Sequence, residues 1–343
     1  MQQLWLRFVQ FYLTIGFKYY YKNFKVVYLD KIPKDKAVIF LSNHQNALLD
    51  PLLISIKSTR KNFFLTRAAV FKNPTIAKIL NSLQMLPVYR MVDGVNIIQK
   101  NKAIFNTCSK LLSKKKSIIL FPEGSHNLQR KIRPLKKGFL RIIEETLQKY
   151  PNTEIVIIPI GVNYQDPLEW GDSMSVFFGN HIFPNEYWKD NELDFNGLSK
   201  EVSSGLKQLT THIESTSEYE NTVEKFTNLH VDFTNPTEVN KCIENNFNYT
   251  GKKVRKDTFL FSMFQFLVKI FYFLPYYVWK KIAAPKVKEK EFIATFRYTM
   301  IIALVPFYLL FLLLIIGVFF GKSIAFIILG IGILLPLITL RIK

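Results

Sequence analysis

Short runs of apolar residues recur along the chain between residue 24 and about residue 190, separated by helical patterns. Most of these runs lack the alternation of apolar and polar positions that marks a strand with one face in water. Strands that are apolar throughout are typical of a sheet covered on both faces by helices. The pattern therefore predicts an α/β domain with a mostly buried sheet flanked by helices. The runs are KVVYL (25–29), AVIFLS (37–42), NFFLT (62–66), SIILF (117–121), EIVIIPIGV (154–162) and SVFFG (175–179).

A helical pattern follows the last of these runs, over residues 198–215. We expect this helix to close a domain that extends over residues 24–230. The chain beyond it, up to Lys256, is polar and rich in Asn, Thr and Glu, so it is predicted to be helix and linker, with the linker over residues 231–256. The apolar positions of the predicted helix, three or four residues apart, are Val202, Leu206, Leu209 and Ile213.

The N-terminal stretch, residues 1–23, is apolar with one narrow polar stripe, because its polar residues recur every three or four positions. Arg7 and Gln10 interrupt the stretch and no small-residue cleavage site follows, which argues against a cleavable signal peptide. We expect an amphipathic helix that lies in the membrane interface. A core helix of a soluble fold is the alternative, since periodicity does not reveal what covers an apolar face.

Two long apolar stretches, residues 299–320 and 323–340, lie near the end of the sequence. About 20 helical residues cross a hydrocarbon core of about 30 Å, so both are predicted to be transmembrane helices joined as a tight hairpin. Lys and Arg gather before the first stretch and after the second, whereas only Lys322 marks the turn. Because positive residues favour the cytoplasmic side, we expect a multi-pass membrane protein whose α/β domain is cytoplasmic.

Residues 257–281 are apolar and long enough to span a bilayer, but Lys269 lies near the middle and Pro275 near the end. A charge at the bilayer centre costs at least about 2.5 kcal/mol. We therefore favour an interfacial or re-entrant segment over a third crossing. A crossing would also move the charged loop to the opposite face from the α/β domain. The membrane region is thus expected to extend over residues 257–343.

The charge balance changes this picture by suggesting partners. Lys and Arg number 46 against 26 Asp and Glu, a net charge of +20, and 49% of the residues are hydrophobic. A protein of such positive charge attracts anionic partners, either nucleic acid or an anionic membrane. The C-terminal stretches favour membrane lipids, and we expect no nucleic acid partner. Cys108 and Cys242 stand far apart without metal-ligand spacing, so no metal site is predicted and a reducing compartment fits.

Candidate chemistry first appears in NHQNALLDP, residues 43–51, directly after the strand predicted at 37–42. Asp50 precedes Pro51, which suits the first position of a helix, so Asp50 is predicted to be an N-cap. A turn before that helix would let His44 meet Asp50 at the carboxyl edge of the sheet, where α/β proteins bind ligands. An imidazole oriented by a carboxylate can act as a general base. A surface or capping pair without chemistry is the alternative.

A second cluster lies in ILFPEGSHNLQRKIRPLKKG, residues 119–138. Gly124 permits close approach of the backbone, and exposed amides with the hydroxyl of Ser125 can cradle an anion. Guanidinium and ammonium groups bind phosphate by charge-assisted hydrogen bonds, so a phosphate group is the expected ligand. A solvated basic loop is the alternative. The cations of this cluster include Arg130, Arg133, Lys136 and Lys137.

Four short blocks, taken together, resemble a known family. NHQNALLDP, LPVYR, FPEGSH and VIIPIGV follow one another in the order of the motif blocks of the glycerolipid acyltransferases. That family includes the lysophosphatidic acid and glycerol-3-phosphate acyltransferases, and the resemblance covers roughly residues 24–190. It implies an α/β acyltransferase domain held at a membrane by its N-terminal segment. It also implies that His44 is the catalytic base and that Asp50 orients it.

The resemblance further implies substrate contacts. Arg90, which ends LPVYR, would bind the phosphate of the acceptor together with Glu123, Gly124 and Ser125. Pro159, in VIIPIGV, would help to form the acyl-donor side.

Two departures from the family pattern bear on the substrate. Five residues separate His44 from Asp50, where most members have four, and we associate this spacing with a branch acting on glycerol-3-phosphate and dihydroxyacetone phosphate. His126 stands where many members carry Arg. Arg130 is the candidate to replace that Arg.

The implied activity is direct O-acyl transfer. His44 would deprotonate a glycerol hydroxyl that attacks the thioester of an acyl-CoA or acyl carrier protein, with no cofactor besides this acyl donor. The expected acceptor is lysophosphatidic acid or glycerol-3-phosphate in phospholipid synthesis. A lysolipid-remodelling acyltransferase and a non-catalytic membrane lipid-binding protein are the alternatives.

Overall fold

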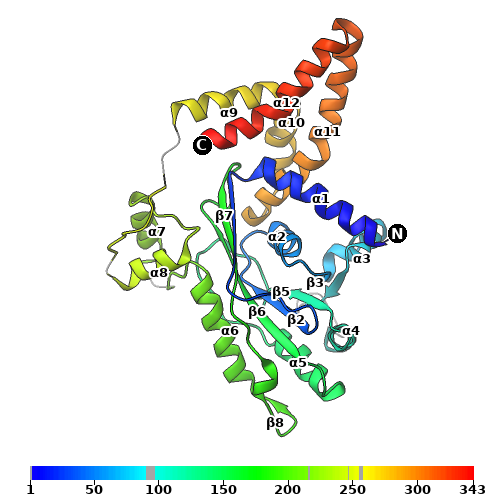
Figure 1. Ribbon diagram of the computed structural model, residues 1–343, viewed down its shortest axis with the longest axis vertical. Helices are drawn as coiled ribbons and strands as arrows, with labels where there is room; N and C mark the ends of the chain where they lie inside the picture. Colours follow the sequence, from blue (N-terminus) through cyan, green and yellow to red (C-terminus); the bar gives the residue numbers. More distant parts are fainter. Residues whose placement is uncertain (1, 90–96, 215–216, 246, 255–257) are drawn as a thin grey trace.

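A seven-stranded sheet occupies the centre of the protein (Figure 1). The computed structural model describes residues 2–89, 97–214, 217–245, 247–254 and 258–343. The strand order is β1-β7-β6-β2-β5-β3-β4. Neighbouring strands are parallel except for β6 and β7, which run antiparallel. The strands are β1 (Asn23–Tyr28), β2 (Ala37–Ser42), β3 (Asn62–Arg67), β4 (Met85–Val88), β5 (Ser117–Leu120), β6 (Ile155–Tyr164) and β7 (Ser173–Phe178).

Helices cover both faces of the sheet, which confirms the α/β class that the uninterrupted apolar strands predicted. Every residue of β2 is buried. Val38 and Phe40 face a core shared with α1 and α2, whereas Ile39 and Leu41 face a second core shared with α4, α5 and α6. The helices of this domain are α1 (Gln2–Tyr20), α2 (Leu49–Lys57), α3 (Pro74–Ser82), α4 (Ile97–Ser113), α5 (Gly138–Lys149) and α6 (Phe195–Leu209).

The chain after α6 differs from the expected pattern. The helix predicted over 198–215 ends at Leu209. Ile213 instead joins a small third core with Phe226 and Val239. Two helices frame this core, so residues 231–256 contain a folded helix and are more than a linker. These helices are α7 (Tyr219–Asn228) and α8 (Pro236–Glu244), and a short hairpin of β8 (Trp188–Lys189) and β9 (Glu192–Leu193) precedes α6.

The membrane region holds two helices that are long and apolar enough to cross a bilayer, α11 (Ile293–Phe320) and α12 (Lys322–Ile342). They contain the stretches 299–320 and 323–340. Gly321 alone separates them, and its φ of 87° lies in the left-handed region that favours glycine. The chain therefore reverses within one residue, as a tight hairpin requires.

The segment 257–281 forms helix α9 (Phe259–Phe271) and helix α10 (Phe273–Tyr277). The helical run that contains α10 bends by 96° from α9, a geometry of a broken span or a re-entrant loop. No single straight helix therefore runs through the described part of this segment.

The N-terminal helix α1 lies between the sheet domain and the hairpin (Figure 1). Its outer side is apolar and exposed, with Leu4 71% and Phe11 65% accessible. Its C-terminal half is packed, because Phe17 stacks on Tyr298 of α11 at 4.6 Å and the hydroxyl of Tyr298 donates to the carbonyl of Leu13 at 2.8 Å. The helix thus combines a buried half with an exposed apolar half of the kind that a membrane interface accepts.

Candidate active site

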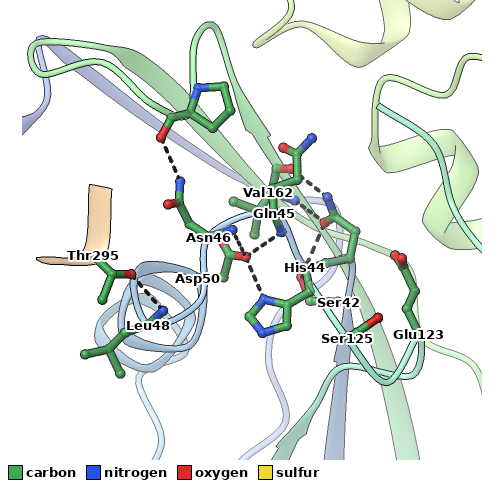
Figure 2. Close-up of polar contacts among 12 residues, drawn as sticks. Ser42, His44, Gln45, Asn46, Leu48, Asp50, Glu123, Ser125, Val162 and Thr295 are labelled. Carbon is green, nitrogen blue, oxygen red and sulfur yellow. Dashed lines mark hydrogen bonds and ion pairs between the residues drawn. The ribbon is translucent and has the colours of Figure 1, made fainter. Parts of the chain in front are cut away.

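His44 and Asp50 meet at the carboxyl edge of the sheet. Strand β2 ends at Ser42, and the following loop turns back so that His44 Nδ1 lies 2.9 Å from Asp50 Oδ2 (Figure 2). Asp50 is fully buried, while the side chain of His44 is 13% exposed. The ring of His44 stacks on Phe121 with centroids 3.9 Å apart, which fixes the imidazole plane. The pair therefore has one buried member and one that reaches the surface.

The prediction that Asp50 is an N-cap is wrong. Helix α2 begins at Leu49, with Leu48 in the N-cap position, so Asp50 sits inside the first turn. Its carboxylate turns back towards the preceding loop, where Oδ2 accepts from the backbone amides of Gln45 and Asn46, each at 2.8 Å. The side chain therefore holds the loop that carries His44 and leaves the helix amides alone.

Tyr164, at the end of β6, completes the surroundings of Asp50. Its hydroxyl donates to Asp50 Oδ1 at 2.6 Å. Burial, followed by the nearby Asp50 carboxylate, raises the pKa of Tyr164 well above its ordinary value, so the phenol stays protonated and donates. An ionised carboxylate only accepts hydrogen bonds, so the nitrogen of His44 that contacts Asp50 must donate. We therefore assign the ring proton of His44 to Nδ1. Nε2 then carries the free lone pair, and no described residue hydrogen-bonds to it.

Asn43 ties this loop to the neighbouring strand. Its amide nitrogen donates to the carbonyl of Val162 at 2.9 Å, and its oxygen accepts from the amide of Val162 at 2.8 Å. The side chain thereby continues the pairing of β2 with β6 beyond Ser42. The position of His44 is fixed by the sheet as well as by Asp50.

The FPEGSH block forms a turn beside His44 (Figure 2). Gly124 has φ 77°, where an L side chain is strained. Arg133 donates to Glu123 Oε2 and to the carbonyl of Ser125, and its Nη1 lies 2.8 Å from Ser125 Oγ. The turn is therefore locked by Arg133, a cation that the sequence placed in the basic cluster without a contact.

The carboxyl of Glu123 is buried, and its Oε1 has no hydrogen-bond partner in the described structure. Burial raises its pKa, and the charge of Arg133 opposes that shift. An unpartnered buried acceptor beside an active site suits a donor from a ligand.

The other predicted contact residues lie in different places. Lys136 is exposed beside the turn, with its Cγ 3.3 Å from the point where a Cβ on Gly124 would lie. Arg130 turns away: its guanidinium donates to the carbonyls of Tyr164 and Gln165 at 2.7 and 2.8 Å. Its amino groups are thus used inside the fold, and the expectation that Arg130 replaces the missing Arg is not supported. Arg90 lies outside the described residues.

Pro159 lies within β6, where its ring comes 3.2 Å from the point where a Cβ on Gly205 of α6 would lie. Successive side chains of a strand alternate between faces. Pro159 accordingly faces α6, while Ile158 and Ile160 face the core beside α2. The structure does not bring Pro159 to the His44 side of the sheet.

A segment from the start of the membrane region reaches this site, a contact that the sequence pattern does not predict. We call residues 289–295 the clamp segment. Thr295 Oγ1 accepts from the amide of Leu48 at 3.0 Å (Figure 2), and the carbonyl of Glu291 accepts from the amide of Ala47 at 3.4 Å. The clamp segment thus supplies acceptors at the start of α2, where helix amides lack partners.

The clamp segment also contacts His126, whose ring lies edge-on to that of His44 at 5.7 Å. His126 Nε2 lies 2.9 Å from Glu289 Oε2, and Phe292 packs edge-on against the same ring at 4.9 Å. With Glu291, these groups bring three potential metal-ligand atoms within 4.8 Å of one another. His126 therefore connects the motif turn to the clamp segment.

Known proteins resemble this chain at the level of sequence. Residues 23–163 match the family model described as Acyltransferase. A probable 1-acyl-sn-glycerol-3-phosphate acyltransferase of Mycoplasma pneumoniae is 31% identical over 224 residues, 59% of this chain and 77% of that protein. The chloroplastic 1-acyl-sn-glycerol-3-phosphate acyltransferase BAT2 of Brassica napus is 27% identical over 119 residues, 34% of this chain and 33% of that protein. The chain thus spans about a third of the length of the plant relative.

Among solved structures, the 1-acyl-sn-glycerophosphate acyltransferase PlsC of Thermotoga maritima aligns with 62% of this chain and 83% of its own. The TM-score is 0.45 at 18% sequence identity. The sequence matches and the motif blocks identify the class: an acyltransferase with an α/β domain and membrane helices. The chain belongs to the glycerolipid acyltransferase family.

Proposed function

We propose that the protein transfers an acyl group from an acyl thioester to the free hydroxyl of lysophosphatidic acid in phospholipid synthesis. The observation that carries this proposal is the contact of 2.9 Å between His44 Nδ1 and Asp50 Oδ2, which leaves Nε2 open beside the FPEGSH turn. A positioned imidazole of this kind is a general base. The acyl donor is a thioester of coenzyme A or of acyl carrier protein.

The reaction needs one proton carrier. Nε2 of His44 takes the proton of the acceptor hydroxyl as its oxygen attacks the thioester carbonyl. The carbon–sulfur bond then breaks, and the thiolate leaves with the proton that the imidazolium returns. Asp50 stabilises the imidazolium through Nδ1 and remains a carboxylate. Atoms and charge balance without a covalent enzyme intermediate.

The FPEGSH turn is the proposed place for the acceptor's glycerol phosphate. Lys136 supplies an exposed ammonium group beside the turn, where it can bind phosphate. Glu123 Oε1, buried and without a partner among the described residues, can accept from a second hydroxyl or from an ordered water. Arg133 neutralises Glu123, so that the site as a whole does not repel an anion.

The printed names of the relatives from Mycoplasma pneumoniae and Brassica napus favour lysophosphatidic acid as the acceptor. The five residues between His44 and Asp50 favour glycerol-3-phosphate, the second candidate. Release of free thiol from acyl-CoA, measured with the purified full chain and each acceptor, separates the two. A lysolipid-remodelling enzyme would instead respond to a lysophospholipid with a larger headgroup.

Replacement of the proposed base tests the mechanism. We expect His44→Gln to lower kcat by a factor of about 10² to 10⁴, the usual contribution of a general base. His181→Gln, on the loop after β7, is the matched control and should keep wild-type turnover. Equal turnover in both variants would refute the assignment of His44. Lipid binding without thiol release in the wild type would favour the non-catalytic alternative.

A further inference from the structure

A cavity of about 600 Å³ lies among the membrane helices. Its walls come from α1, α9, α10, α11 and α12, with the loop at Trp170 at one side. Neither His44 nor Asp50 is among the described residues that line it. The volume falls in the range of about 300–1,000 Å³ that is typical of sites for small ligands.

The lining of the cavity is mostly apolar but includes charged side chains. Lys269 and Arg297 line it, together with the exposed carboxylate of Glu169. Leu304 and Leu309 are among its apolar lining residues. The helical rise from residue 297 to residue 309 gives about 18 Å along α11, close to half of a hydrocarbon core of about 30 Å. A ligand with a charged group and an apolar chain of leaflet length suits this lining.

Lys269 lacks an acidic partner in the described structure, although it lies in an apolar segment. Its ammonium group donates to Gln265 at 3.1 Å and lies 6.0 Å from the ring centre of Tyr276. Arg297 lies 5.4 Å from the ring centre of Trp279 and likewise forms no described ion pair with a carboxylate. Charged residues in membrane segments are costly without a partner and commonly mark a functional site. An anion from outside the chain would supply the partner.

We propose that this cavity binds one phosphate-bearing lipid, with the phosphate at Lys269 and Arg297 and an acyl chain along α11. Guanidinium and ammonium groups prefer phosphate over other lipid groups because they form charge-assisted hydrogen bonds with it. Trp279, whose ring lies beside Arg297, suits the headgroup level of a bilayer. The site is separate from the proposed acylation site and does not depend on it.

The contact of the phosphate with Lys269 and Arg297 is tested by adding lipids to the purified full chain. The retained lipid is measured by native mass spectrometry. We expect phosphatidic acid or phosphatidylglycerol to be retained at least tenfold more than phosphatidylcholine. The double variant Lys269→Gln/Arg297→Gln should abolish this preference. Lys322→Gln/Arg341→Gln removes the same charge outside the cavity and should keep it. Equal retention of phosphatidylcholine by the wild type, or an unchanged preference in the first variant, would overturn the proposal.

The two anionic probes distinguish the source of the lipid. Retention of phosphatidic acid alone indicates a lipid of the proposed reaction, whereas retention of both indicates a bulk membrane lipid. Either result supports a site for a phosphate-bearing lipid.

The proposed position of the acyl chain along α11 is tested by filling the cavity with a large side chain. Val305→Trp places a large ring in the wall of the cavity, whereas Val318→Trp places one on the same helix at a position that is 80% exposed. We expect at least tenfold weaker retention of the anionic lipid in Val305→Trp and wild-type retention in Val318→Trp. Equal retention in both, at matched melting temperature, would refute a chain along α11.

The proposed lipid site and the proposed acyl-transfer activity can be refuted independently of each other. His44→Gln should bind the anionic lipid as the wild type does, because it does not line the cavity. Absence of the anionic preference in the wild type, with intact acyl transfer, would overturn the lipid site alone. Intact binding without transfer in the wild type would leave the lipid site standing and remove the proposed activity.

Discussion

Single hydrogen bonds decide the geometry of the candidate site. Asp50 Oδ2 accepts from His44 and from two backbone amides, and Oδ1 accepts from Tyr164. The carboxylate therefore cannot rotate without breaking several bonds at once. Sequence reasoning identified His44 and Asp50 because both stand in one short motif. It missed Tyr164 because 114 positions separate this residue from Asp50 and only the folded sheet brings them together.

Removal of the Tyr164 hydroxyl tests its positioning role. Tyr164→Phe leaves Oδ1 of Asp50 without its donor, and hydrogen bonds to charged groups contribute about 1.5–3 kcal/mol. We expect kcat to fall by a factor of about 10 to 100, with little change in the KM of the acceptor. Tyr28→Phe, which removes a hydroxyl bonded to the carbonyl of Lys57, is the control and should leave kcat unchanged. A change in KM alone would argue that Tyr164 contacts substrate.

Asp172 predicts a pH dependence of stability. Burial raises its pKa to about 8 in the folded protein, whereas an Asp in an unfolded chain titrates near 3.9. The unfolded state therefore loses this proton first, so the free energy of unfolding falls as pH rises from about 4 to about 8. Asp172→Asn removes the titration and should flatten this part of the Tm profile. An equally steep fall in the variant would show that another group causes it.

At the scale of helices and strands, burial made most elements of the α/β domain predictable. β2 and β6 are buried throughout and mostly apolar, because each is covered on both faces. Strand β4 was missed, since its four residues include Pro87 and carry little periodic signal. Helix α8 was missed because its buried side, Val239 and Cys242, is small and lies in a polar stretch. Short elements owe their structure to neighbours that the local pattern does not contain.

The contact between the clamp segment and α2 is also invisible in the sequence, because 247 positions separate Thr295 from Leu48. Thr295→Val keeps the shape of the side chain but leaves the Leu48 amide without its acceptor, at a cost of about 1–3 kcal/mol. We expect kcat to fall about tenfold through displacement of the loop that carries His44. Thr295→Ser should restore it.

Thr299→Val is the matched control for this test. Thr299 lies one turn further along α11, and its hydroxyl bonds only within that helix in the described structure, to the carbonyl of Thr295 at 2.8 Å. It should keep wild-type kcat. Equal losses in Thr295→Val and Thr299→Val would indicate a general effect on α11.

For the whole molecule, the distribution of positive charge predicts orientation. Lys288 precedes the hairpin and Lys322 begins α12, at the turn. Positive residues concentrate on the cytoplasmic side, so we expect both outer ends of the hairpin there, with the α/β domain. The structure supplies the two long apolar helices of this hairpin.

Cysteine labelling checks this orientation in intact cells. With the buried Cys108 and Cys242 replaced by Ala, a membrane-impermeant reagent should label Lys322→Cys from outside and reach Lys288→Cys only after the cells are opened. The reverse pattern would place the α/β domain on the outer side.

The hydrogen bond between Thr295 and Leu48 joins a reactive loop to the first turn of a helix that belongs in lipid. A newly made chain whose hairpin has not yet inserted would lack this bond, and we expect its loop to be unassembled. Such a chain would leave cellular thioesters untouched until it reached the bilayer where its acceptor resides. The rate of thioester hydrolysis, compared between chains kept out of vesicles and chains inserted into them, measures how far the protein stays inactive before it reaches the membrane.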